Sequence, residues 1–338
     1  MKGVIMAGGL GTRLRPLTFK RPKPLVPILG KPVISYILDS FVRGGFTSVV
    51  LTTSYMPELI IKGIERPILY SFEKEPLGTA GGVKKVAEFL DDTFLVGSGD
   101  VLADVDVEAL YRYHKEMGGK ATMALTRVED PSEFGVAVLD DAGRIEQFVE
   151  KPKREEAISN LVNAGIYVLE PDVLNLIPEG KEYDFSRDLF PKLLEDIYGF
   201  ELSGLWIDIG RPGDLLRANR DMALKEGKGK PIISPSSGIK GSAINGPSFI
   251  GAESSLIDCQ ISSSYICKST KMKGAFLENS LIMDGCSIGE GAKISNSILA
   301  EGCKIGDGAI IDEGILGDGI VVLGNSAIKG RVFNLEGK

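Results

Sequence analysis

Two hydrophobic patterns divide the chain, and they predict two different architectures. In the first part, short apolar runs alternate with segments whose apolar residues recur at helical spacing. The runs are GVIMAGG (3–9), SVVLTTS (48–54) and TFLVGSGD (93–100), and the helical segments include PVISYILDSFVRGG (32–45) and TAGGVKKVAEFL (79–90). Strands that alternate with helices predict an α/β fold with a mostly parallel sheet covered on both faces. Ligands bind beyond the carboxyl ends of such strands, which makes the first glycine-rich loop and Asp100 candidate site positions.

The last part of the chain carries a short repeat instead. Apolar residues recur there at steps of 6, 6 and 5 residues, and the series then starts again; its members are Ile282, Ile288, Ile294, Leu299, Ile305, Ile311, Leu316, Val322 and Ile328. Glycines lie between them at a density that would cost a helix about 1 kcal/mol per residue. A hexapeptide period with one inward apolar residue per strand predicts a parallel β-helix with three strands per coil.

These patterns set the expected domain boundaries. We expect an α/β domain over residues 1–227 and a β-helix over residues 249–338. Residues 228–248 are rich in Gly, Ser, Pro and Lys, so we interpret them as a connector.

Composition narrows the possible functions. The 39 basic and 46 acidic residues give a net charge of −7, which disfavours a general nucleic-acid-binding role. The sequence shows neither a signal peptide nor the ~20 consecutive apolar residues of a membrane span, so we expect a cytoplasmic protein without membrane contact.

Cysteine and histidine usage restricts the chemistry further. The four cysteines form no close pair, so we expect buried, reduced thiols rather than disulfides or a zinc site. Cys286 and Cys303 lie 17 residues apart, at equivalent places of successive coils. The single histidine, His114, lies in what reads as a polar helix, which disfavours a Ser-His-Asp triad and zinc sites with several histidines.

The glycine-rich loop after the first apolar run has the features of a phosphate site. Gly8, Gly9 and Gly11 allow backbone N–H groups to approach an anion closely, and Thr12 follows them. Arg13, Arg15 and Lys23 add positive charge. The loop is neither a Walker A motif nor GxGxxG, because no GK[ST] follows and Leu14 replaces the third glycine. A tight turn between a strand and a helix is the structural alternative.

At this point the residues resemble a known family. The string GG-x-GTRL-x-P-LT followed by PKPL-x-P-x-x-GKP is similar to the signature of the sugar-1-phosphate nucleotidyltransferases. The resemblance continues over essentially the whole chain. It implies a Rossmann-like catalytic domain and, as in several members, a C-terminal left-handed β-helix, which agrees with the repeat.

The resemblance also implies roles for individual residues. The loop EPLGTAGG (75–82), with Gly78 and Thr79, resembles the nucleobase and ribose loop, while Arg13 and Lys23 are the implied catalytic cations. Asp100 and Asp208 match magnesium-binding aspartates, and the implied sugar phosphate contacts are Gly135, Glu150, Lys151 and Asn163. Each has a structural alternative: Asp100 as a helix cap, Asp208 as an ordinary loop acid, the lysines as solvated charges and Asn163 as a partner of backbone groups.

The implied chemistry suits a chain with one histidine. The sugar phosphate attacks the α-phosphorus of a nucleoside triphosphate and pyrophosphate leaves. Such transfer needs positioning and charge neutralisation more than acid–base catalysis. Mg²⁺ prefers one or two carboxylates together with phosphate oxygens and water. We therefore expect a nucleoside triphosphate and a hexose 1-phosphate as ligands, with Mg²⁺ as the cofactor.

The choice of substrates depends on Glu73. An ionised carboxylate only accepts hydrogen bonds, which suits the two adjacent donors of guanine better than thymine or uracil. Together with the EPLGTAG string, this favours GTP and mannose 1-phosphate; dTTP, UTP or ATP with glucose 1-phosphate is the alternative. A further alternative is that the chain is a regulatory homologue without catalytic activity. The β-helix lacks histidines, so we expect a structural role, either in the contacts of a homo-oligomer or in ordering the catalytic domain, rather than acyltransferase or carbonic-anhydrase-like activity.

Overall fold

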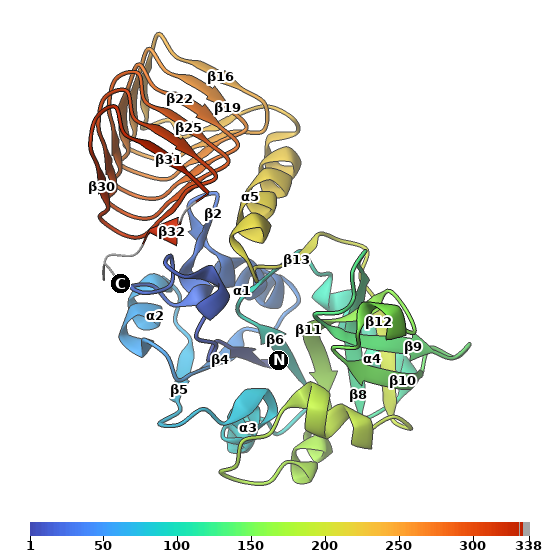
Figure 1. Ribbon diagram of the computed structural model, residues 1–338. Helices are drawn as coiled ribbons and strands as arrows, with labels where there is room; N and C mark the ends of the chain where they lie inside the picture. The colour runs from blue at the N-terminus through green and yellow to red at the C-terminus, as the bar shows by residue number, and fades with distance from the viewer. Residues whose placement is uncertain (331, 334–338) are drawn as a thin grey trace. The chain divides into compact units, whose positions relative to one another are not determined.

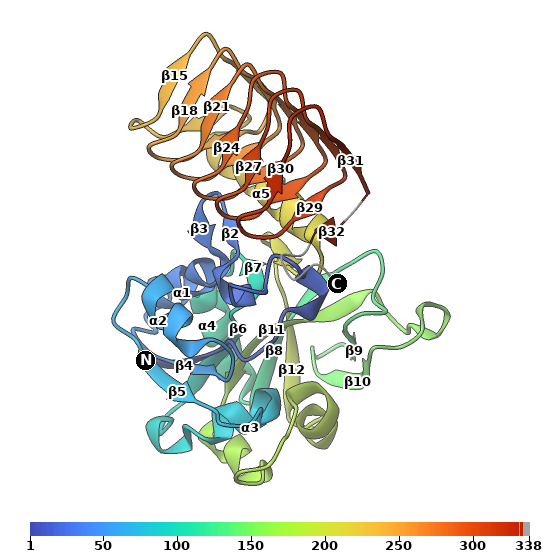
Figure 2. The same ribbon diagram turned by 60° about the vertical axis from the view of Figure 1, so that its left-hand side comes forward.

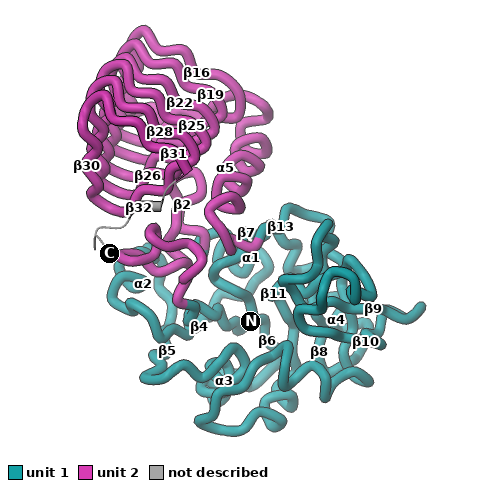
Figure 3. The backbone as a smooth tube through the Cα atoms, viewed as in Figure 1, with its two compact units in different colours: residues 1–9, 34–207 teal, residues 10–33, 208–338 magenta. Residues whose placement is uncertain are grey.

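The computed structural model describes residues 1–330 and 332–333. The chain forms two compact units: unit 1 comprises Met1–Gly9 and Ile34–Ile207, and unit 2 comprises Leu10–Val33 and Asp208–Lys338. Figure 3 shows them in teal and magenta. The division differs from the boundaries expected from the sequence, because the segment with Arg13 and Lys23 groups with the β-helix residues. Each unit is described by itself below.

Unit 1 is built on a nine-stranded sheet, seven of whose strands have the order β10-β9-β11-β6-β1-β4-β5. Four strands run parallel: β1 (Lys2–Met6), β4 (Ser48–Thr53), β5 (Leu69–Phe72) and β6 (Phe94–Ser98). The strands beyond β6 are β8 (Ala121–Arg127), β9 (Gly135–Leu139), β10 (Ile145–Glu150), β11 (Leu161–Leu169) and β12 (Ile197–Glu201). The Rossmann-like architecture is confirmed, whereas β11 runs antiparallel to β6, β8 and β9, so the sheet is more mixed than expected.

Helices and short turns surround this sheet (Figure 1). The α-helices are α1 (Val33–Arg43), α2 (Pro57–Gly63), α3 (Gly78–Lys84) and α4 (Val107–Met117). Short 3₁₀ or π turns cover Ala87–Phe89, Arg154–Glu156, Pro171–Leu176, Phe185–Leu189 and Phe190–Lys192, and the short strands β7 (Val101–Ala103) and β13 (Trp206–Asp208) pair with each other. The helix expected over 79–90 is thus a short α-helix followed by a turn.

Two strand glycines let α1 approach the sheet closely. A Cβ atom at Gly3 in β1 would lie 2.9 Å from the Phe41 ring, and one at Gly97 in β6 would also lie 2.9 Å from it. Phe41 is completely buried on α1. The aromatic ring therefore fills the space that side chains on the two strands would need, and the strands that lead to Gly8 and Asp100 are held against a packed core.

Unit 2 contains three parallel sheets, which stack into the coils seen in Figure 2. The first has β14 (Ile232–Ile233), β17 (Phe249–Ile250), β20 (Tyr265–Ile266), β23 (Leu281–Ile282), β26 (Ile298–Leu299), β29 (Ile315–Leu316) and β32 (Val332–Phe333). The second has β15 (Gly238–Lys240), β18 (Ser255–Ile257), β21 (Lys271–Lys273), β24 (Ser287–Ile288), β27 (Lys304–Ile305) and β30 (Val321–Val322). The third has β16 (Ala243–Asn245), β19 (Gln260–Ser262), β22 (Phe276–Glu278), β25 (Lys293–Ser295), β28 (Ile310–Asp312) and β31 (Ala327–Lys329).

The register of these strands confirms the predicted repeat. Leu281 pairs with Ile298 and Ile298 with Ile315, so each of these coils takes 17 residues. The periodic residues from Ile282 to Val322 all belong to one buried core, against which Ile328 packs. All four cysteines are free and buried, as expected. The architecture is consistent with a left-handed β-helix.

The connector expected over residues 228–248 is wrong, because these residues form the first coil. Ile232, Ile239 and Ile244 pair in register with Phe249, Leu256 and Ile261 of the next coil. Gly and Ser belong at the tight corners of a coil, so the composition of a linker and that of a coil look alike. At the other end, residues 331 and 334–338 of the expected β-helix lie outside the described residues.

The segment from Leu10 to Val33 packs within unit 2. It holds the 3₁₀ turns Thr12–Leu14 and Lys23–Leu25 and a hairpin of β2 (Pro27–Ile28) and β3 (Lys31–Pro32). The buried Asn219 of α5 (Pro212–Gly227) holds this hairpin: it accepts from Leu29 N at 2.9 Å and donates to Pro27 O at 3.3 Å. Within the described residues, no helix has the length and apolar character to cross a membrane.

Candidate functional site

The glycine-rich loop requires glycine at position 11 in particular. Gly11 has φ +61°, and Thr18 Oγ1 donates to its carbonyl at 2.8 Å. A Cβ atom here would lie 3.0 Å from Thr18 and 3.1 Å from the Cβ of Lys23. The loop therefore passes directly against the stem of Lys23 only because residue 11 has no side chain. Gly8, Gly9 and the exposed Thr12 leave the loop backbone accessible.

Asp208 brings the two predicted catalytic cations of unit 2 together. Lys23 Nζ lies 3.4 Å from Asp208 Oδ1, and Arg13 Nη2 lies 3.8 Å from Asp208 Oδ2. The side chain of Lys23 is only 9% exposed and that of Asp208 21%, whereas Arg13 is 52% exposed. Two cations thus share one carboxylate beside the glycine-rich loop. Such a cluster suits a phosphate-bearing ligand.

Gly210 is a residue of this cluster that the sequence analysis missed. A Cβ atom at this position would lie 2.9 Å from Asp208 Oδ2 and 3.2 Å from Arg13 Nη2. Any side chain would therefore enter the space between the carboxylate and the guanidinium. The signal was present as D-x-G in WIDIGRP (206–212), but only the fold shows what the glycine faces.

A second group of predicted residues lies in unit 1, where α3 begins. Gly78 has φ +71°, and a Cβ atom there would lie 2.6 Å from Tyr183 O. Thr79 Oγ1 donates to Asp184 Oδ2 at 2.7 Å and accepts from Phe185 N at 2.9 Å. The loop 75–82 is thus fixed to a segment about a hundred residues later, which explains why sequence inspection could not find Asp184.

Asn163 in β11 contacts the same segment. Its Nδ2 donates to Tyr167 OH at 2.9 Å and to Ser186 Oγ at 3.2 Å, and its Oδ1 accepts from Gly165 N at 2.8 Å. The pairing of β11 with β8 is irregular between Asn163 and Tyr167, which turns the amide out of the ladder. Burial raises the pKa of Tyr167, so its hydroxyl stays protonated.

Glu150 completes this group at the end of β10. It pairs in register with Gly135, where a Cβ atom would lie 2.9 Å from Glu150 Oε2. Burial raises the pKa of Glu150; Lys151, whose Nζ lies 3.6 Å from Glu150 Oε1, opposes this shift, and Asp184 adds to it. Lys151 has φ +49° and donates its backbone N–H to Phe134 O at 2.9 Å, which directs a 55% exposed ammonium away from the strand.

Glu73 has a structural contact that the sequence did not reveal. Glu73 Oε2 accepts from Leu77 N at 3.0 Å, so the carboxylate caps the loop that leads to Gly78. The other oxygen, Oε1, lies 2.7 Å from the position of a Cβ atom at Gly82. Glu73 is half-buried, and it shapes the predicted nucleobase loop whatever it contacts in a ligand.

The two predicted metal ligands come from different units. Asp100, in unit 1, lies in the turn between β6 and β7, where its Oδ1 accepts from Ser98 Oγ at 2.5 Å. Asp208, in unit 2, offers the carboxylate described above. Among the described residues, no group of three or more His, Cys, Asp or Glu is arranged to hold a metal. Two carboxylates fit the preference of Mg²⁺, which takes its other ligands from phosphates and water.

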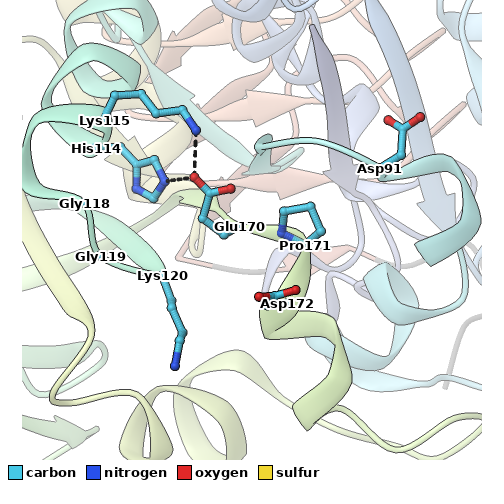
Figure 4. Close-up of a pocket in the computed structure, with 9 residues that line it drawn as sticks. All are labelled: Asp91, His114, Lys115, Gly118, Gly119, Lys120, Glu170, Pro171 and Asp172. Carbon is cyan, nitrogen blue, oxygen red and sulfur yellow. Dashed lines mark hydrogen bonds and ion pairs between the residues drawn. The ribbon is translucent and has the colours of Figure 1, made fainter.

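A cavity of about 540 Å³ lies elsewhere in unit 1 (Figure 4). It is lined by Asp91, His114, Lys115, Gly118, Gly119, Lys120, Glu170, Pro171 and Asp172. Asp91 precedes β6 and Asp100 follows it, so the cavity opens at the opposite end of that strand. Lys115 pairs with Glu170 at 2.7 Å, and burial lowers the pKa of His114. None of the predicted site residues lines this cavity.

Comparison with known proteins finds two family models and several relatives. The family model described as nucleotidyl transferase matches residues 2–225, and one described as a GlmU-like, C-terminal hexapeptide matches residues 232–330. A UTP–glucose-1-phosphate uridylyltransferase of Synechocystis sp. is 38% identical over 331 residues, covering 86% of this chain and 85% of the relative.

Other relatives cover less of the chain. A mannose-1-phosphate guanyltransferase of Debaryomyces hansenii is 42% identical over 230 residues, covering 64% of this chain and 63% of the relative, and the one of Saccharomyces cerevisiae is 41% identical. The chain thus spans less than two thirds of those guanyltransferases. A solved structure from Bacillus anthracis, assigned as a glucose-1-phosphate thymidylyltransferase, is 27% identical with a TM-score of 0.58, covering 65% of this chain and 94% of that one.

The family models account for both architectures, and the relatives include one that the chain matches along most of its length. The chain therefore belongs to the nucleotidyl transferase family, as a sugar-1-phosphate nucleotidyltransferase with a C-terminal hexapeptide-repeat domain.

Proposed function

We propose that the chain transfers GMP from GTP to mannose 1-phosphate, giving GDP-mannose and pyrophosphate. Glu73 supports the choice of guanine, because a carboxylate at the nucleobase loop accepts from the two adjacent donors of that base and repels the carbonyls of uracil and thymine. Relatives named as mannose-1-phosphate guanyltransferases are 41–42% identical over 230 residues. The uridylyltransferase and the thymidylyltransferase among the similar proteins favour the alternatives UTP and dTTP with glucose 1-phosphate, and ATP remains the third alternative expected from the sequence.

The observation that carries the catalytic proposal is the shared carboxylate of Asp208. Lys23 and Arg13 are held beside it, next to a glycine-rich loop. In the reaction, negative charge grows on the leaving pyrophosphate, and fixed cations stabilise it more in the transition state than in the ground state. We assign this role to Lys23 and Arg13. Gly8, Gly9, Gly11 and Thr12 would offer backbone and hydroxyl donors to the triphosphate.

Asp100 and Asp208 would hold Mg²⁺ through one oxygen or more each. The ion would neutralise charge on the phosphate groups of the two substrates. Asp208 would also keep Arg13 and Lys23 oriented. Nucleobase and ribose contacts are assigned to Glu73, Gly78 and Thr79, where the loop backbone is fixed by its contacts with Tyr183 and Asp184.

The sugar phosphate is assigned to the group around Glu150. Glu150 and Asn163 would accept from sugar hydroxyls, and the exposed Lys151 would bind the phosphate. Gly135 leaves room for the Phe148 ring and for the Glu150 carboxylate, and so helps to place Glu150. Tyr167 and Asp184 hold Asn163 and Thr79 and join this group as positioning residues. The cytoplasmic location expected from the sequence stays a prediction.

The substrate proposal is tested with five nucleoside triphosphates against glucose-, mannose-, galactose- and glucosamine-1-phosphate, with Mg²⁺ present and pyrophosphate release as the readout. We expect the largest release with GTP and mannose 1-phosphate, and a loss of about a hundredfold or more in Asp208→Asn. If release is largest with UTP, dTTP or ATP, the assignment of guanine is wrong, but the assignment of nucleotidyl transfer stands. Nucleotide binding without release would instead indicate a regulatory homologue.

Replacement of Gly210 tests the geometry around Asp208. Gly210→Ala puts a methyl group 2.9 Å from Asp208 Oδ2 and forces the carboxylate or Arg13 to move. A displacement of about 1 Å near reacting groups costs roughly a hundredfold in rate, so kcat should fall by about that factor. Gly213→Ala is the matched control, since no atom lies within 4 Å of its added Cβ. Equal kcat in the two variants would contradict the assigned role of this cluster.

The raised pKa of Glu150 predicts an acid limb in the pH profile. The ionised carboxylate accepts hydrogen bonds at both oxygens, whereas protonation turns one oxygen into an O–H donor. Glu150 becomes protonated at a higher pH than an ordinary glutamate, whose pKa is about 4.3. As the pH falls through this raised pKa, the KM for sugar phosphate should rise. Glu150→Gln should have a raised KM that no longer varies over this range.

The exposed Glu146 lies on the same strand, so Glu146→Gln is the control and should retain the wild-type profile. The assignment fails if Glu150→Gln keeps the acid limb of the wild type.

We also propose that the β-helix contributes to a homo-oligomer. Its outward-facing residues include large apolar side chains: Phe276 is 40% exposed and Ile310 47%, and they lie on strands of the same sheet. Ile310→Glu should lower the mass per particle measured by light scattering, because it places a charge in the contact. Val149→Glu, at a 41% exposed position of unit 1, is the control. A monomeric wild-type chain would refute the proposal.

A further inference from the structure

Arg21 connects the segment that carries the catalytic cations to the coils of the β-helix. Its Nη2 lies 2.7 Å from Glu301 Oε2 and 3.5 Å from Asp318 Oδ1, and its Nη1 donates to Met283 Sδ at 3.3 Å. These partners are 262 to 297 residues away in sequence, and all belong to unit 2. The Arg21 side chain is only 15% exposed, so this arginine is held against the β-helix rather than solvated.

The coil period explains why acidic residues gather at this point. Ser287 pairs with Lys304 and Lys304 with Val321 in register, so Glu301 and Asp318 occupy the same corner of successive coils, as does Asp284 one coil earlier. The corner is hydrogen-bonded along the stack: Glu301 N donates to Asp318 Oδ1 at 3.1 Å, and Gly302 N to Asp284 O at 2.9 Å. We call Asp284, Glu301 and Asp318 the acidic corner.

The acidic corner needs a cation. Burial raises the pKa of Asp284; Glu301 adds to the shift, while Lys268 and Arg21 oppose it. Asp318 is 12% exposed, and its Oδ2 is buried without a hydrogen-bond partner among the described residues. Carboxylates stacked in this way repel one another, and a guanidinium suits them because its planar fork reaches more than one acceptor. Arg21 is that guanidinium.

The anchor lies two residues before Lys23. Pro22 joins them with φ fixed at −66°, and its carbonyl accepts from Leu25 N at 2.9 Å, which starts the turn at Lys23. On its other side, the stem of Lys23 lies against Gly11. Contacts on both sides thus fix the backbone and Cβ of Lys23, and its side chain is only 9% exposed beside Asp208. A shift of the backbone at Arg21 would be transmitted directly to this ammonium.

We propose that Arg21 is a positioning residue for nucleotidyl transfer: the acidic corner of the β-helix holds Arg21 and thereby fixes Lys23 beside Asp208. The β-helix thus supports catalysis through a single arginine, in addition to any role in assembly. This inference rests on the proposed role of Lys23. It predicts that the loss of Arg21 acts on the rate of the chemical step, through Lys23, rather than on substrate affinity.

The test measures kcat and KM of the full-length chain in five variants: Arg21→Met, Arg21→Lys, Lys23→Met, the double variant Arg21→Met/Lys23→Met, and Lys20→Met. We expect Arg21→Met to lower kcat about tenfold or more with less than a threefold change in either KM, since a displaced stabilising group costs rate. Arg21→Lys, which keeps the charge but not the fork, should recover part of that loss. Lys20 is an exposed neighbour, and its variant should match the wild type.

The double variant separates positioning from a merely structural role. If Arg21 acts through Lys23, the double variant should be no slower than Lys23→Met alone. Independent losses that multiply would overturn the proposal, and so would a wild-type kcat in Arg21→Met while Lys23→Met is impaired. An active Lys23→Met would instead refute the proposed role of Lys23 itself.

Glu301→Gln provides a test that does not depend on the folding of the arginine variant. Its carboxylate is 59% exposed, and the substitution removes a charge without changing the size of the side chain. We expect Glu301→Gln to lower kcat less than Arg21→Met does. When it is added to Lys23→Met, it should not lower kcat any further. Glu290→Gln, at a 64% exposed carboxylate of the same β-helix that pairs with Lys273, is the control and should leave kcat unchanged. A fall in kcat that persists in the Lys23→Met background would contradict the inference.

Discussion

The carboxylate of Asp208 is the constraint on which the functional arrangement of unit 2 depends. It holds Lys23 and Arg13, which lie about two hundred residues earlier in the chain, and each cation takes a different oxygen. Several features serve this contact by keeping space free: Gly11 has no side chain toward Lys23, and Gly210 has none toward Arg13. The contact lies in a partly buried place, where electrostatic interactions are stronger than in water. A lysine and an arginine that are held in this way suit a triphosphate.

The period of the β-helix places residues of similar chemistry, as well as similar shape, at equivalent positions of successive coils. Each coil cannot bury its core alone, so neighbouring coils must keep their register. A fixed register places the same corner of every coil in one column, and acidic residues at 284, 301 and 318 therefore become neighbours. Arg21 makes use of that column. A repeat that stabilises itself through inward isoleucines and leucines thus presents a polar feature to a segment from the other end of the chain.

The sequence predicted features that depend on local pattern and missed those that depend on distant contacts. The β-helix followed from its 17-residue period, whereas the phosphate role of the loop with glycines next to cations stays a prediction. The first coil was mistaken for a connector, because corners and linkers share a composition. Tyr167 and Asp184 were missed, since they act by holding Asn163 and Thr79 across the fold. Glu73 was read as a ligand contact, although its capping of Leu77 needs the loop geometry to be seen. The antiparallel pairing of β11 with β6, β8 and β9 could not be predicted from the order of strands and helices along the chain.

The boundary between the two compact units falls between Gly9 and Leu10, inside the glycine-rich loop. The unit that contains the β-helix therefore also contains Arg13, Arg21 and Lys23, although these residues lie near the start of the chain. Recombination that exchanged the C-terminal repeat for that of another protein would separate Arg21 from Glu301 and Asp318. A repeat domain from another protein would therefore need acidic residues at the corner that faces Arg21.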